Sequence, residues 1–135
     1  MCAVGLIAAL AAAFVLPAGL DVVPGLNNLW LSRSAAAAVA RHPPRPGEAV
    51  LAVGYSEPSL VFLLGTAARL VTAAPADGQL TGASMALVSD RYDAEFQRLL
   101  RTRRLSARAI DRIAGLDYSA GGSKQVLTLY ALEPG

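Results

Sequence analysis

The chain has 135 residues, 54% of them hydrophobic and 16% charged, a composition that excludes an intrinsically disordered protein and suits one domain with a buried core. Its 12 Lys and Arg residues exceed its 10 Asp and Glu residues only slightly. This balance, without any basic and aromatic motif for stacking bases, argues against a nucleic-acid partner.

Residues 2–16 form an uninterrupted apolar run that ends at Pro17. We expect residues 1–16 to be the end of a transmembrane helix, because the run has the right composition but fewer than the roughly 20 residues that span a bilayer. A signal peptide is one alternative, although no Lys or Arg precedes the run. A core helix is another, although the run has no polar face. The single cysteine, Cys2, excludes an intrachain disulfide and a thiolate metal cluster.

Residues 17–47 are predicted to form a loop, an alanine-rich helix over 34–41 and a proline-rich linker. Ser32 or Ser34 is the expected N-cap of the helix. Trp30 suits either a membrane interface or a gap in the core. His42 has no second ligand at metal-binding spacing, so no metal site is expected.

The most informative stretch is an apolar run over 50–53 that breaks at Gly54 and restarts after Pro58. It predicts a buried strand, a tight turn at Gly54 and a buried two-turn helix. Ser56 is the expected N-cap, Glu57 lies where a helix dipole favours an anion, and Pro58 suits the first helical turn. Gly65 is the expected C-terminal stop of that helix.

Two more strands are predicted over 68–72 and 84–89, followed by a helix from Asp90 to Arg103. The apolar face of that helix is expected to consist of Tyr92, Phe96, Leu99 and Leu100. Four arginines load its end (Arg98, Arg101, Arg103 and Arg104), and they suit a solvated basic face or a site for phosphate or a lipid headgroup.

The last third predicts a β-hairpin, with strands over 107–118 and 125–132 and a glycine-rich turn between them. Gly115 is the expected position of a bulge. The fold class that follows is a single α/β (α+β) domain over residues 48–135, with a mixed sheet of about five strands.

No catalytic motif is present: the sequence has no G-x-G-x-x-G, no Walker A, no G-x-S-x-G and no second histidine. Glu57 is an acid beside a turn that suits either a cleft or a structural role at the helix start. Asp117 and Tyr118 are candidates for the same cleft. No catalytic residue, cofactor or metal is therefore expected in this chain.

The segment Gly54-Tyr55-Ser56-Glu57-Pro58-Ser59-Leu60-Val61-Phe62-Leu63-Leu64-Gly65-Thr66, followed by Asp117-Tyr118-Ser119 and Leu127-Thr128-Leu129-Tyr130, resembles the C-terminal part of one enzyme class. This class comprises the bacterial integral-membrane glycosyltransferases that use polyprenyl-phosphate sugars. It is related to 4-amino-4-deoxy-L-arabinose lipid A transferase and to dolichyl-phosphate-mannose protein mannosyltransferases. The resemblance covers nearly the whole chain, although Asp117 stands where the pattern has an asparagine.

The resemblance implies a fragment of a transferase that moves a sugar from a polyprenyl-phosphate donor to lipid A, a glycan or a protein. It implies a plasma-membrane location, with residues after about 17 on the periplasmic side and a catalytic N-terminal membrane domain as partner. Gly54, Tyr55, Glu57, Pro58, Asp117 and Tyr118 then line a cleft or have structural roles, and this part alone is inactive. A membrane-tethered accessory domain and a small enzyme that uses Glu57 and Asp117 are the alternatives.

Overall fold

The computed structural model describes residues 31–71, 77–117 and 121–135. In chain order its elements are α3 (Leu31–Arg41), β1 (Ala49–Val53), α4 (Pro58–Leu64), η2 (Gly65–Ala67), β2 (Ala68–Val71), η3 (Asp77–Leu80), β3 (Ala83–Ser89), η4 (Asp90–Tyr92), α5 (Asp93–Thr102), β4 (Leu105–Asp117) and β5 (Ser123–Pro134). They form one five-stranded mixed sheet with helices, which confirms the predicted α/β (α+β) class.

The strand order in the sheet is β2-β1-β3-β5-β4. Strand β1 runs parallel to both β2 and β3, whereas β5 runs antiparallel to β3 and to β4. All five residues of β1 are buried. A strand covered on both faces requires a continuous apolar run, which is the pattern of Ala49–Val53.

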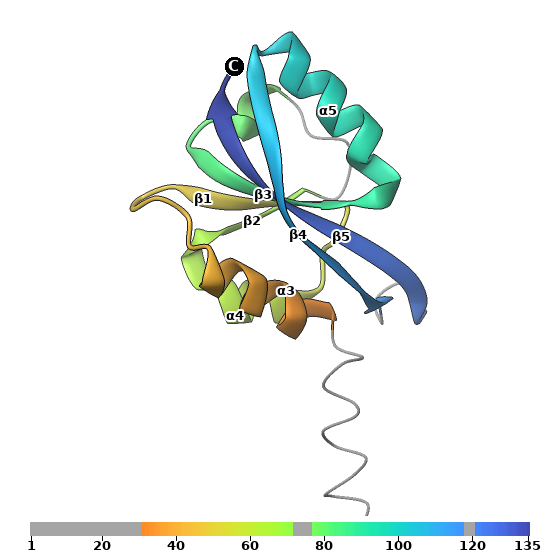
Figure 1. Ribbon diagram of the computed structural model, residues 1–135. Helices are drawn as coiled ribbons and strands as arrows, with labels where there is room; N and C mark the ends of the chain where they lie inside the picture. The colour runs from red at the N-terminus through yellow and green to blue at the C-terminus, as the bar shows by residue number, and fades with distance from the viewer. Residues whose placement is uncertain (1–30, 72–76, 118–120) are drawn as a thin grey trace, which may run out of the picture.

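Helices cover both faces of the sheet (Figure 1). One apolar cluster joins α3 and α4 to side chains such as Val50, Leu87 and Leu129, and the other joins α5 to side chains such as Leu51, Val88 and Tyr130. In each pair of neighbours, such as Val50 and Leu51, alternation along the strand sends one side chain to each face.

The alanines of α3 let that helix lie close to the sheet. Ala35 and Ala38 are fully buried, and the same cluster includes Leu31 and Val39. A Cβ atom on Gly115 of β4 would lie 3.2 Å from Leu31 Cδ1. Gly115 therefore serves a close approach between helix and strand.

The predicted bulge at Gly115 is wrong, because the irregularity in β4 lies at Ile110. Ala109 pairs with Tyr130 and Asp111 with Leu129, which leaves Ile110 as the extra residue. Before it, Leu105 and Ala107 pack into the α5 cluster, and after it, Ile113 packs into the α3 cluster. One extra residue changes the face to which the following odd-numbered residues point.

The ends of two helices differ from those expected. Helix α3 begins at Leu31, so Ser32 and Ser34 lie inside it and do not cap it. In α4, Pro58 is in the first turn and Gly65 ends the helix with φ 63°, as predicted, but Glu57 occupies the N-cap position in place of Ser56 and makes no side-chain capping bond. The predicted helix from Asp90 begins with the 3-10 turn η4 and continues as α5.

The prediction that α4 is a buried helix is wrong, because Leu60 is its only buried residue. By contrast, α5 has the expected apolar face: Phe96 and Leu100 are buried in the core, and Tyr92 and Leu99 pack against it.

The predicted end of a transmembrane helix, Trp30 and Tyr118 lie outside the described residues. Within the described ranges, none of the helices has the length and apolarity that crossing a bilayer requires.

Candidate functional site

The chain leaves β1 and β3 toward opposite faces of the sheet. After β1 it forms α4, on the face that α3 covers, and after β3 it forms η4 and α5, on the other face. These two strands are parallel neighbours, so their carboxyl ends lie side by side. Open α/β sheets bind ligands in the crevice outside such a reversal point.

A polar crevice of about 250 Å³ lies at this position. Its walls come from the ends of β1 and β3 and from the hairpin strands: Gly54, Ser56, Ser89, Asp90, Arg91, Asp117, Ser123, Lys124 and Gln125. Two acids and two bases face it together with three serines. Such a lining can hydrogen-bond a polar ligand and balance either sign of charge.

Gln125 of β5 is one of the residues that line the crevice. Its Nε2 donates to Gly54 O at 3.1 Å and to Ser89 Oγ at 2.7 Å, which ties the ends of β1 and β3 to the hairpin. Ser89 Oγ in turn donates to Asp90 Oδ1 at 3.4 Å. The position of the crevice wall is therefore fixed by bonds between three strands.

Beside the crevice, Tyr55 and Glu57 belong to a cluster with Ser32 and Ser59. Glu57 Oε2 accepts hydrogen bonds from Ser32 Oγ at 2.8 Å, Tyr55 Oη at 2.9 Å and Ser59 Oγ at 3.0 Å. Ser59 Oγ also lies 2.7 Å from Ser32 Oγ, so its single proton is shared between Glu57 and Ser32. This cluster, called the Glu57 cluster below, joins the first turns of α3 and α4.

The hydroxyl of Tyr55 is held in its neutral form. Burial raises the pKa of Tyr55 well above its ordinary value, and the nearby negative charges of Glu57 and Asp117 raise it further, against the opposing hydrogen bond with Ser32. Tyr55 is 1% exposed. The neutral, buried phenol donates its hydrogen bond to Glu57 Oε2.

The structure therefore divides the residues predicted to line a cleft. Gly54 and Asp117 line the crevice, where Asp117 is buried, and Tyr55 and Glu57 lie in the Glu57 cluster. Pro58 starts α4, and Tyr118 lies outside the described residues. Glu57 is not part of the crevice lining, although both Glu57 and Asp117 lie close enough to Tyr55 to raise its pKa.

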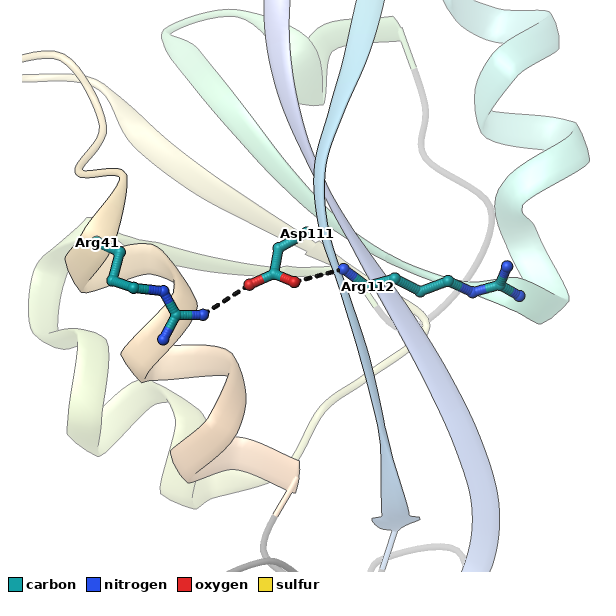
Figure 2. A network of polar contacts seen from close by, with 3 residues as sticks. All are labelled: Arg41, Asp111 and Arg112. Atoms are coloured by element: carbon teal, nitrogen blue, oxygen red, sulfur yellow. Dashed lines mark hydrogen bonds and ion pairs between the residues drawn. The ribbon is translucent and has the colours of Figure 1, made fainter.

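A larger open hollow of about 620 Å³ lies beside the bulge, between α5 and the hairpin. Two acids on its wall are engaged: Tyr130 Oη donates to Asp93 Oδ1 at 2.6 Å, and Asp111 accepts a 2.6 Å bond from Arg41 of α3. Figure 2 shows Arg41 and Asp111 directed at one another, while the side chain of Arg112 points away. Arg41, with the Arg112 backbone N–H, lowers the pKa of Asp111 below its ordinary value.

Among the described residues, no three His, Cys, Asp or Glu side chains are grouped so as to hold a metal ion. His42 follows the end of α3 and takes no part in the crevice.

Sequence reasoning missed Ser32 and Gln125 as members of these sites. Ser32 Oγ bonds partners 23 to 27 residues away, and Gln125 bonds Gly54 across 71 residues. Local patterns carry no signal for such pairs, since the contacts exist only once α3 and the hairpin pack beside β1.

The chain was also compared with known proteins. No family model, no curated protein and no solved structure matches it.

Proposed function

We propose that this chain is the periplasmic covering domain of a plasma-membrane glycosyltransferase. The whole enzyme would move a sugar from a polyprenyl-phosphate donor to lipid A, a glycan or a protein. The resemblance of residues 54–66 to that class of enzymes supports the proposal. The catalytic groups and the donor site would belong to an N-terminal membrane domain, which is the proposed partner.

The observation that favours a covering role is the state of Glu57. Its Oε2 atom accepts three hydrogen bonds from side chains of the same domain. A general acid or base needs a free site for a proton within reach of the substrate. Through its Oε2 atom, Glu57, the acid in the central motif, links α3 to α4, which supports a structural role for the motif.

A second candidate function is that of a membrane-tethered binding domain without enzymatic activity. The observation that favours it is the crevice between the ends of β1 and β3, where open α/β sheets bind ligands. Its serines, acids and bases suit a small polar ligand. Under this alternative the domain works without a catalytic membrane domain.

The size of the native product separates the two candidates. An epitope is placed after Gly135 at the chromosomal locus, and membrane and soluble fractions are immunoblotted. We expect a membrane band several times heavier than 13.9 kDa, the mass of this chain. A band near 13.9 kDa in the membrane fraction would instead favour the tethered binding domain.

The covering role also predicts that the isolated 135-residue chain has no transferase activity. The purified chain is incubated with a radiolabelled polyprenyl-phosphate sugar and lipid A, and transfer to lipid A is measured. Transfer above the background of heat-denatured chain would contradict the covering role, because it would place catalytic groups within these residues.

A further inference from the structure

Helix α4 exposes three consecutive large apolar side chains. Val61 is 36% exposed, Phe62 88% and Leu63 44%. On the neighbouring edge strand β2, Leu70 is 37% exposed. These four residues, called the α4 apolar surface below, are the large hydrophobic side chains that the described part of the chain leaves exposed.

The arrangement on the helix suits a fluid partner better than a second helix. Consecutive helical residues are about 100° apart, so Val61, Phe62 and Leu63 spread over a broad sector. A seam between packed helices uses residues three or four positions apart along one narrow stripe. Lipid imposes no such register, and it can surround side chains that point in several directions.

The part of the surface on α4, Val61 to Leu63, is also free of charge along the chain, and the first charged residue after it is Arg69, next to Leu70. No Asp, Glu, Lys or Arg occurs from Pro58 to Ala68. The nearest acid on α4, Glu57, is held by hydrogen bonds from Ser32, Tyr55 and Ser59. Insertion of this segment therefore requires no charged group to be stripped of water.

The chain outside the described residues joins the domain next to this surface. Helix α3 begins at Leu31, and its Ser32 bonds Ser59 in the first turn of α4 at 2.7 Å; Figure 1 shows α3 and α4 side by side. The apolar run of residues 2–16 is separated from Leu31 by 14 residues, 17–30. These residues span at most about 50 Å, which bounds the distance from the run to α4.

We infer that the α4 apolar surface docks on the lipid bilayer, with Phe62 inserted at the boundary between headgroups and acyl chains. This inference rests on the membrane tether of the proposed function. The domain would then lie with α3 and α4 toward the membrane and α5 on the side away from it.

The test measures insertion depth in vesicles. The full chain with Trp30→Phe and Phe62→Trp is reconstituted into phosphatidylcholine vesicles, with or without bromine on the acyl chains. An interfacial side chain lies about 5–10 Å into this boundary region, so we expect the indole at position 62 to be quenched about twofold or more. The control is Trp30→Phe with Ala94→Trp, an exposed position on α5, whose indole should keep its emission.

Other outcomes identify which proposal fails. If the chain floats with the vesicles but position 62 is not quenched, the docking inference is wrong and the membrane tether stands. Concentration-dependent crosslinking of the floated chain through position 62, without quenching, would likewise contradict docking and point to a second copy. If the chain does not float with the vesicles, the docking inference is wrong, and the size of the native product still tests the proposed function separately. Circular dichroism equal to that of the unsubstituted chain confirms that each variant is folded.

Discussion

At the residue scale, Gly54 joins the end of β1 to the Glu57 cluster. Its φ is 72°, a conformation that side chains with a Cβ rarely adopt. A Cβ at this position would lie 2.2 Å from Tyr92 Cδ2. Both the backbone conformation and the contact with the Tyr92 ring therefore require glycine.

Gly54 and Gly65 allow the two requirements to be separated. Gly65 has φ 63°, but no atom lies within 4 Å of the position that a Cβ would occupy there. We expect Gly65→Ala to lower the free energy of unfolding by about 1–3 kcal/mol through backbone strain alone, because φ 63° with ψ −143° is a conformation that is almost restricted to glycine. Gly54→Ala should lower it by about 1–3 kcal/mol more, because the Tyr92 ring must also move.

Urea unfolding of the full chain, followed by circular dichroism, measures both changes. In the Tyr92→Ala background, where the ring is absent, Gly54→Ala should lower the free energy of unfolding by less than it does in the unsubstituted chain. Equal losses for the two single variants would contradict the role assigned to the Tyr92 contact.

At the scale of elements, α4 and α5 cover opposite faces of the sheet, and the phenylalanine of one is exposed while that of the other is buried. Phe96 of α5 is fully buried, and its ring centroid is 5.9 Å from that of Tyr130. Phe62 of α4 is 88% exposed. The same residue type therefore contributes to the core on one helix and to the molecular surface on the other.

This contrast predicts very different effects of the same substitution. Phe96→Ala should lower the free energy of unfolding by about 3–5 kcal/mol, because it leaves a cavity in the α5 cluster. Phe62→Ala should change it by less than about 0.5 kcal/mol, as surface substitutions usually do. Thermal and urea unfolding of the two variants measure the difference, and a large loss for Phe62→Ala would mean that α4 packs more deeply than described.

The bulge in β4 is the second feature at this scale. Ile110 shifts the register so that one edge strand supplies Leu105 and Ala107 to the α5 cluster and Ile113 to the α3 cluster. Asp111, next to the bulge, is then positioned for its bond with Arg41 of α3. That pair is solvent-exposed, with side chains 59% and 32% exposed, so its contribution to stability is small.

At the scale of the whole molecule, both apolar clusters contain a buried tyrosine with a raised pKa. Burial is the main cause for Tyr55 and for Tyr130, and a hydrogen bond with a carboxylate, Glu57 or Asp93, adds to it. Below the ordinary tyrosine pKa of about 10, both side chains are neutral in the folded and unfolded states, and the stabilisation is complete.

Stability should therefore fall as the pH rises above about 10. In that range the unfolded tyrosines lose their protons while the folded ones retain them, so the folded state binds more protons. The slope contributed by Tyr55, which has the large shift, approaches about 1.4 kcal/mol per pH unit, and Tyr130 adds a slope of the same sign. Urea unfolding at a series of pH values from 8 to about 11.5, on both sides of the ordinary tyrosine pKa, measures this slope.

Tyr55→Phe and Tyr130→Phe should each remove part of the slope, and the double variant should remove most of it. Because the two residues lie in different clusters, the changes should be close to additive. Tyr92→Phe, in which the ring that contacts Gly54 is retained, is the control. A slope that persists in the double variant would show that other groups control the alkaline transition.

The sequence by itself determined the class of the fold and the place of most elements. The continuous apolar run at β1, the glycines at 54 and 65, the proline at 58 and the apolar face of α5 are local signals, and the structure agrees with them. Turn chemistry and periodicity act over a few residues, so they can be read without knowing what packs against what.

Only the tertiary structure decided how exposed α4 is, where β4 bulges and what Glu57 does. An apolar helix seven residues long has the same sequence pattern whether it is covered or not. How much of α4 is exposed depends on how much of it the neighbouring helix α3 covers. The position of the bulge depends on which face each half of β4 must reach. Glu57 accepts a hydrogen bond from Ser32, which is 25 residues away in sequence. Long-range packing determines these properties, and no local pattern encodes it.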